Sequence, residues 1–209
     1  MSGSARSGDW LSYYQATAGR PPRPTLLQAL QNRDPRAAPG HAIDLGCGDG
    51  RDTIELLRRG WTVLAIDSEA AALDRLKTRP DLPPGALLTT LCGKFEEVAW
   101  PPSGWPPADL INASFALPIC PPASFPALWQ KLTAALAPGG RFAGQLYGDR
   151  DSWAHKSDMT FHDAAAVRQL LTGYVIERLD EEESDAVTPR GEAKHWHIFH
   201  IVARKRDPT

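Results

Sequence analysis

Apolar positions along the chain follow two alternating spacings from Ala42 onward. Short runs of consecutive apolar residues, typical of strands buried on both faces, precede segments in which apolar positions recur every three or four residues. This alternation predicts an α/β fold in which helices cover both faces of a mostly parallel sheet. The expected strands are His41–Leu45, Thr62–Ile66, Leu87–Leu91, Asp109–Ala113 and Arg141–Leu146. The expected helices are Asp52–Arg59, Glu69–Thr78 with Ser68 as its N-cap, and Phe125–Leu136, closed by Pro138, Gly139 and Gly140.

The two ends of the chain follow other patterns. The last third predicts a helix at Ala164–Leu171 and two strands, Tyr174–Asp180 and Lys194–Ala203, joined by a loop that contains TPRG. These strands are expected to form an antiparallel hairpin. Before the first strand we expect a helix, a proline-rich crossover and a second helix from Thr25. The stretch WPPSGWPP at 100–107 predicts a surface turn, because proline cannot continue regular structure.

The ends of the first two strands carry a ligand-binding pattern. Residues 42–50, AIDLGCGDG, run from a strand into Gly46, Gly48 and Gly50. Such a turn lets the backbone approach a ligand and aims the next helix at it. The following strand ends on Asp67, and a carboxylate there can accept hydrogen bonds from both hydroxyls of a ribose. The pattern predicts a pocket for a cofactor that contains a nucleoside.

The spacing of the glycines narrows the choice of cofactor. The pattern is G-x-G-x-G, whereas the dinucleotide fingerprint requires G-x-G-x-x-G around a pyrophosphate. Asp44, two residues before the first glycine, suits a cationic or amine-bearing ligand better than a phosphate. S-adenosylmethionine has an ammonium, a sulfonium, a carboxylate and a ribose, and no phosphate. We therefore expect S-adenosylmethionine, and a nicotinamide oxidoreductase is disfavoured.

At this point the sequence IDLGCGDGRDT closely resembles the first motif of class I S-adenosylmethionine-dependent methyltransferases. The phrases ADLINASFALPIC, PGGRFAGQLYGDRDSW and KHWHIFHIVARK resemble the small tellurite-resistance and thiopurine-type members, so the resemblance covers Asp9 to Lys205. It implies a Rossmann-like fold whose mostly parallel seven-stranded sheet ends in an antiparallel C-terminal hairpin. We expect a single domain over 1–209, made of a helical lid or crossover (1–40), a cofactor-binding half (41–150) and a C-terminal half with the hairpin (151–209).

The resemblance also implies which residues bind the cofactor. Asp44, the glycine turn and Arg51 would surround its amino-acid end, Asp67 its ribose, and Ser68 its adenine. The resemblance implies further cofactor-binding residues in four places: the adenine rim (Phe95, Glu96), the glycine turn (Cys47), the end of the fourth strand (Asn112, Ala113, Ser114) and the lid (Tyr14, Arg20). A paired tyrosine before an arginine and a stiff proline run favours such a lid over the cofactor carboxylate.

No residue stands out as catalytic. Methyl transfer from a sulfonium depends mainly on positioning, and His155, His162 and Tyr147 are candidates if the acceptor needs a base. We expect no metal site, because His195 and His197 share one face of their strand while His200 takes the other, without a carboxylate at ligand spacing. A structural or substrate-rim role is favoured for these histidines. The acidic run DEEESD at 180–185 is expected to be a solvated hairpin end.

Composition limits the partners. The formal net charge of −2 gives no positive field that would recruit nucleic acid. Three widely spaced cysteines indicate a reduced protein, and the sequence shows neither a signal-peptide core nor a membrane-spanning run, so we expect a cytoplasmic location and no membrane partner. The sequence does not indicate an oligomeric state.

The resulting hypothesis is a methyltransferase that acts on a small-molecule acceptor and releases S-adenosylhomocysteine. The acceptor could be a thiol, a metalloid oxyanion, an amine or a hydroxyl. The alternative is a non-catalytic regulatory or scaffold domain that binds S-adenosylmethionine.

Overall fold

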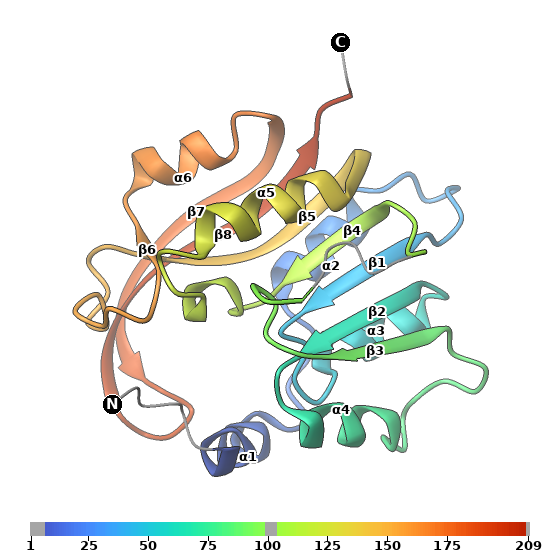
Figure 1. The fold of residues 1–209 in the computed structure, drawn as a ribbon, viewed down its shortest axis with the longest axis horizontal. Coiled ribbons are helices and arrows are strands. Elements are labelled where there is room, and N and C mark those ends of the chain that lie inside the picture. Colours follow the sequence, from blue (N-terminus) through green and yellow to red (C-terminus); the bar gives the residue numbers. More distant parts are fainter. Residues whose placement is uncertain (1–6, 99–103, 208–209) are drawn as a thin grey trace.

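Eight strands form one sheet in the computed structural model, which describes residues 7–98 and 104–207. The main strand order is β3-β2-β1-β4-β5-β8-β7, and β6 pairs with β5 off this path (Figure 1). The pairs among β1 to β6 are parallel, whereas β8 is antiparallel to β5 and to β7. The bounds are β1 His41–Leu45, β2 Thr62–Asp67, β3 Leu88–Cys92, β4 Ala108–Ala113, β5 Leu136–Gly148, β6 Phe161–His162, β7 Tyr174–Val187 and β8 Ala193–Lys205. The predicted mostly parallel sheet with a C-terminal hairpin is confirmed, and the two-residue β6 is an addition.

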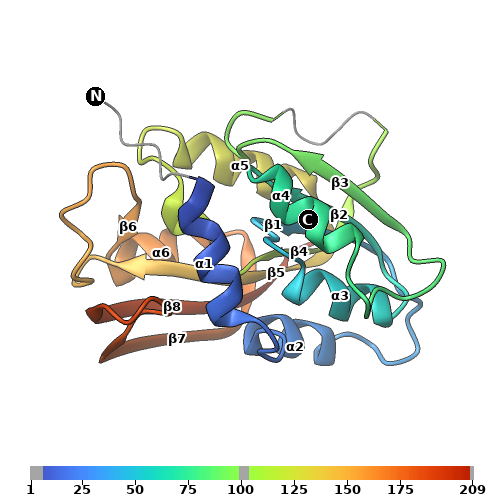
Figure 2. The same ribbon diagram turned by 90° about the horizontal axis from the view of Figure 1, so that it is seen from below.

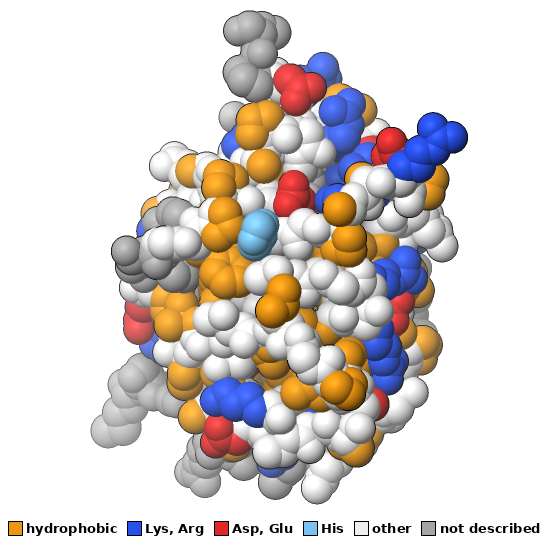
Figure 3. Space-filling model, turned by 90° about the vertical axis from the view of Figure 1, so that its right-hand side faces the viewer, with side chains coloured by type: hydrophobic (Ala, Val, Ile, Leu, Met, Phe, Trp, Pro, Cys, Tyr) orange, Lys and Arg blue, Asp and Glu red, His pale blue; other side chains and the backbone are white. Residues whose placement is uncertain are grey.

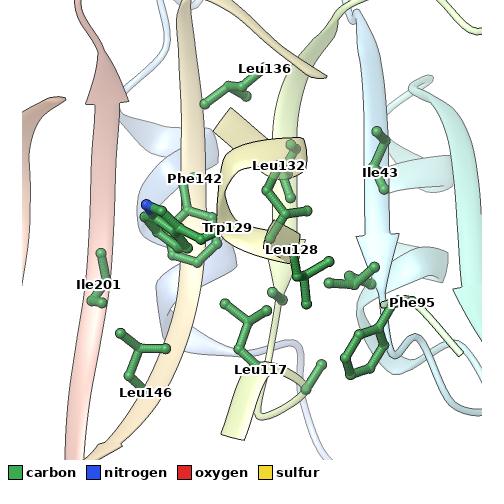
Figure 4. Packing of buried hydrophobic residues seen from close by; sticks show 14 of the residues in the cluster. Ile43, Phe95, Leu117, Leu128, Trp129, Leu132, Leu136, Phe142, Leu146 and Ile201 are labelled. Atoms are coloured by element: carbon green, nitrogen blue, oxygen red, sulfur yellow. The ribbon is translucent and has the colours of Figure 1, made fainter. Parts of the chain in front are cut away.

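Helices cover both faces of this sheet. On one face, α2, α3 and α4 contribute to a buried cluster with residues such as Leu26, Ile54 and Leu76. On the other face, α5 and α6 pack through Trp129 and Val167 against the second cluster, and Figure 4 shows α5 over the middle strands. The helices are α1 Ser7–Thr17, α2 Pro24–Gln31, α3 Arg51–Arg58, α4 Ala70–Lys77, α5 Phe125–Ala135 and α6 Ala164–Leu170, with a 3₁₀ helix, η1, at Leu117–Ile119.

The parallel strands end at one edge of the sheet, and α1 lies across that edge (Figures 1 and 2). The register places Asp44 at the end of β1 beside Asn112 of β4. This is the edge at which open α/β sheets bind ligands. The opposite end, where the parallel strands begin, presents apolar and charged side chains intermixed (Figure 3).

Several predicted boundaries need correction. Ser68 does not cap α4, because the N-cap residue is Glu69, whose backbone N–H donates to Asp67 Oδ1. Residues 138–140 were expected to close the helix that corresponds to α5. They lie instead in β5, which begins directly after α5. β7 continues seven residues beyond Asp180, so the acidic run belongs to a strand. Residues 100–103 of the expected surface turn lie outside the described part of the chain.

A buried ion pair joins β8 to the segment after β5. Lys194 and Asp151 bond to each other, and both side chains are 0% exposed. The Lys194 ammonium lies 4.3 Å from the ring centroids of Trp153 and Trp196, and 5.2 Å from that of Tyr147. Burial lowers the pKa of Lys194, and the carboxylate opposes that shift. The pair therefore anchors the hairpin beside the C-terminal end of β5.

Candidate active site

The floor of the site is a buried network of two carboxylates and one amide. Asn112 Nδ2 donates to Asp44 Oδ1 at 2.8 Å and to Asp52 Oδ2 at 3.0 Å. The hydroxyl of Thr53 donates to the other oxygen of Asp44 at 2.5 Å. Burial raises the pKa of Asp44 to about 7, and the charge of Asp52 adds to this rise. A cation above this floor would therefore be stabilised, since it compensates the two acids.

This arrangement predicts a specific pH dependence of stability. An unfolded aspartate has a pKa of about 3.9, whereas Asp44 in the folded chain has a pKa of about 7. Between these values the folded state holds a proton that the unfolded state has released, so the free energy of unfolding falls as the pH rises. Asp44→Asn should remove this part of the slope in denaturant titrations at a series of pH values. The exposed Asp74 provides the control: Asp74→Asn should keep the slope, and parallel curves for wild type and Asp44→Asn would contradict the assignment.

The glycine turn above the floor admits no side chain. Gly46, Gly48 and Gly50 have φ angles of 64°, 56° and 90°, in the region that other residues adopt at a cost. A Cβ atom on Gly48 would lie 2.8 Å from Tyr14 Cε1. Cys47 is buried between these glycines, and burial raises the pKa of its thiol, which argues against a nucleophilic role.

Asp67 closes the pocket on the side of β2. Its Oδ2 accepts the Gly48 N–H at 2.8 Å, and its Oδ1 accepts the Glu69 N–H at 2.9 Å. The side chain lines the pocket, and burial raises its pKa. Each carboxylate oxygen keeps a second acceptor position, so Asp67 can still receive the hydroxyls of a ribose.

The N-terminal segment forms the wall opposite the sheet. Tyr14 of α1 is 8% exposed and packs on Gly48, and burial raises the pKa of its phenol. Pro21 O accepts a hydrogen bond from Arg51 Nε at 2.6 Å, which ties the crossover to the start of α3. Arg20 is exposed and does not line the pocket, whereas Arg23 does. The arginine of this segment that reaches the pocket is therefore three residues later than expected.

Ten of the fifteen residues expected to bind the cofactor line the pocket. They are Tyr14, Asp44, Gly46, Cys47, Gly48, Arg51, Asp67, Ser68, Phe95 and Ser114. The other five do not line it: besides Arg20, they are Gly50 against Leu76, Asn112 and Ala113, buried within the sheet, and Glu96, whose carbonyl accepts from Lys131.

Sequence reasoning missed several lining residues, among them Trp10, Thr17, Arg23, Asp52 and Phe115. Phe115 has a φ of 58° and is the only non-glycine residue with positive φ in the described ranges. Its N–H donates to Gln145 Oε1, and its ring lies 6.2 Å from that of Tyr147. Such strain often occurs at ligand sites. A sequence signal for Asp52 was available, because Asp52 follows the glycine turn directly in the stretch RDT at 51–53 and so lies in the first turn of the next helix.

None of the three candidate bases lines the pocket. Burial raises the pKa of Tyr147, and the charge of Asp151 adds to this rise. Burial lowers the pKa of His162 to about 4, and its ring packs on Phe125. His155 is exposed and bonds to Ser152 O. None of these three side chains is therefore placed to accept a proton from an acceptor in the pocket.

The histidines of β8 pair with the acids of β7. His195 contacts Asp185 at 2.7 Å and Glu183 at 3.1 Å, and His200 contacts Glu182 at 2.8 Å. His197 is fully buried and contacts Glu181 at 2.9 Å. Carboxylates that the sequence separates are thus brought next to the histidines. Within residues 7–98 and 104–207, no group of three or more His, Cys, Asp or Glu side chains is placed to hold a metal ion.

The pocket can be tested for its fit to S-adenosylmethionine. Arg51 Nη1 is buried and has no hydrogen-bond partner among the described residues. A guanidinium in this position needs an anionic partner, and the cofactor carboxylate is one. The floor of Asp44 and Asp52 suits an ammonium, and Asp67 suits a ribose. The residues of the pocket therefore fit the cofactor.

Comparison with known proteins places this fold and site in a class. Residues 42–140 match the family model of a methyltransferase domain. The trans-aconitate 2-methyltransferase of Paracidovorax citrulli is 33% identical over 156 residues, which are 69% of this chain and 56% of that protein. The chain thus spans about half the length of this curated relative.

Two solved structures share the fold at lower identity. TehB from Haemophilus influenzae has a TM-score of 0.69 at 16% identity, covering 87% of this chain and 61% of that one. The 1,6-didemethyltoxoflavin-N1-methyltransferase of Burkholderia thailandensis, solved with its acceptor and S-adenosylhomocysteine, has a TM-score of 0.64 at 21% identity, covering 96% and 87%.

A sheet of order 3-2-1-4-5-8-7, with a glycine turn after its first strand and an acid after its second, defines the class I methyltransferase architecture. The chain belongs to the class I S-adenosylmethionine-dependent methyltransferase family. No helix in the described residues is long and apolar enough to cross a membrane.

Proposed function

We propose that this chain transfers a methyl group from S-adenosylmethionine to a small-molecule acceptor and releases S-adenosylhomocysteine. The observation that carries the proposal is the buried, unpartnered Nη1 of Arg51, a residue that lines the same pocket as Asp44, Asp52 and Asp67. The names of these two relatives give trans-aconitate and 1,6-didemethyltoxoflavin as acceptors of those proteins. Their variety supports a small acceptor without selecting one.

We propose that each part of the cofactor has its own partner. Arg51 holds the carboxylate, the floor of Asp44 and Asp52 compensates the ammonium, and Asp67 holds the ribose. Ser68, which follows β2, and Phe95, which follows β3, both line the pocket and contact the adenine. Three of the expected residues, Glu96, Asn112 and Ala113, support the pocket without lining it. Glu96 shapes the adenine rim, and Asn112 holds Asp44 and Asp52 of the floor in place.

Bound S-adenosylmethionine supplies an activated methyl group on a sulfonium. The chain's own contribution is positioning: α1 covers the carboxyl edge of the sheet, and Tyr14 excludes water from the glycine turn. Holding two reactants in line accounts for up to roughly 7–11 kcal/mol of a barrier. We propose no general base, since none of the three candidates lines the pocket.

Binding and turnover together test this function. Calorimetry of cofactor-free protein should show one site for S-adenosylmethionine and for S-adenosylhomocysteine. Asp67→Ala should weaken binding by about 1.5–3 kcal/mol, the range for a hydrogen bond to a charged group, and Asp67→Asn should lose less because one acceptor oxygen remains. Binding without release of S-adenosylhomocysteine from any acceptor in a broad panel would favour the non-catalytic scaffold. Absence of binding heat would reject the cofactor itself.

We also propose a cytoplasmic location and small-molecule partners only. Cys47, Cys92 and Cys120 are free thiols, as expected in a reducing compartment. The net charge of −2 gives no support to nucleic-acid binding.

A further inference from the structure

The pocket contains one more guanidinium than the cofactor can neutralise. Arg51 and Arg23 both line it, and S-adenosylmethionine has one carboxylate. The pKa of Arg51 is lowered first by burial and then by the charge of Arg23, so the two cations are close enough to repel each other. If Arg51 takes the cofactor carboxylate, Arg23 is left facing the remaining space of the pocket.

Arg23 is held in place through its backbone. It is the N-cap residue of α2, and its N–H donates to Asp52 Oδ1 at 2.9 Å, so the segment is fixed to the first turn of α3. The side chain is half-buried, and no carboxylate of a described residue forms an ion pair with it. Its neutral neighbours are the Tyr13 hydroxyl, 3.5 Å from Nη2, and the Phe115 ring, whose centroid lies 4.4 Å from Cζ.

Phe115 lies beside Arg23 in the lining of the pocket. The residue lies two positions after the end of β4, and its positive φ and the hydrogen bond from its N–H to Gln145 fix its backbone there. A guanidinium stacked on an aromatic face keeps its N–H edge open for a planar, bidentate partner. Carboxylates match that edge in geometry and in charge.

We propose that the methyl acceptor is a small organic acid and that Arg23 binds its carboxylate beside Phe115. This inference rests on the proposed function, because it assumes that the cofactor occupies the Arg51 side of the pocket. The carboxylates of Asp44 and Asp67 disfavour a second anion on the cofactor side of the pocket, so the acid is directed to the Arg23 side. Arg23 is thus a specificity-determining residue that contacts substrate.

The test measures binding of acids to protein loaded with S-adenosylhomocysteine. The probes are benzoate, cinnamate and succinate, each paired with its primary amide, and the readouts are calorimetry and the melting temperature. At least one acid should bind at least about 10-fold more tightly than its amide. Arg23→Gln should remove about 10- to 150-fold of acid affinity, the equivalent of a lost charged hydrogen bond, and Arg23→Lys should recover only part of it because lysine cannot bind bidentately.

Controls separate this inference from the proposed function. Arg36→Gln makes the same charge change at an exposed site outside the pocket and should leave acid affinity unchanged. S-adenosylhomocysteine should bind the Arg23→Gln variant as it binds wild type. Equal binding of acids and amides, or acid binding that is unaffected by Arg23→Gln, would overturn the inference while the cofactor site stands. Failure of S-adenosylhomocysteine to bind wild type would instead reject the proposed function.

Discussion

Replacing Asp151 with alanine should lower the free energy of unfolding by about 3–5 kcal/mol, the cost of leaving a buried charge without its partner. Lys194 is fully buried among three aromatic rings and would keep only the carbonyl of His195, 3.3 Å away, as a polar partner. Chemical denaturation near neutral pH measures the loss.

Replacing the other partner of the ion pair, Lys194, should lower the free energy of unfolding by less. In Lys194→Met the carboxylate of Asp151 still accepts the N–H groups of Trp153 at 2.9 Å and of His197 at 3.2 Å. The exposed pair of Lys94 and Glu97 serves as the control, because breaking it should change stability by no more than about 1 kcal/mol. Equal losses for Asp151→Ala and for the surface variant would contradict the buried ion pair.

Deletion of residues 1–19 should reduce affinity for S-adenosylhomocysteine by about 100-fold. The deletion removes the contacts of Trp10 and Tyr14 with the pocket, and burying one such side chain is worth about 1.5–3 kcal/mol. The sheet should still fold, since the buried clusters that involve the helices from α2 onward remain. Calorimetry measures the affinity, and circular dichroism checks the fold.

Tyr14 offers a finer comparison within this helix. Tyr14→Phe keeps the ring that packs on Gly48 and should bind nearly as wild type, whereas Tyr14→Ala opens the turn to water. Cleavage between Gln15 and Arg23 by a protease should also slow when S-adenosylhomocysteine is added. If the truncated chain binds the ligand as the full chain does, α1 is packing and not a lid.

The cofactor edge was predictable because its signals are local. A run of apolar residues into alternating glycines specifies a strand, a tight turn and a helix within about ten residues, and β1 has the predicted bounds. An acid at the end of β2 follows from the same alternation. The structure places Asp44, Gly48 and Asp67 at one pocket for this reason.

Positions that depend on distant partners were not predictable. Arg20 and Arg23 flank the same prolines, and Arg23 reaches the pocket because its N–H bonds to Asp52, 29 residues away. The acidic run was expected to be a solvated hairpin end, and aspartate and glutamate are indeed depleted in strands. It remains in β7 because His195, His197 and His200 on β8 pair with its carboxylates, and such cross-strand pairs override propensity.

That acidic strand is also the border of the sheet. β7 ends the strand order and is 14 residues long, so its outer side offers backbone N–H and C=O groups to another polypeptide. Five of the six residues from Asp180 to Asp185 are acids. A second copy that added its own β7 to this border would bring two rows of negative charge together. The acidic run on β7 therefore disfavours edge-to-edge aggregation of the sheet at neutral pH.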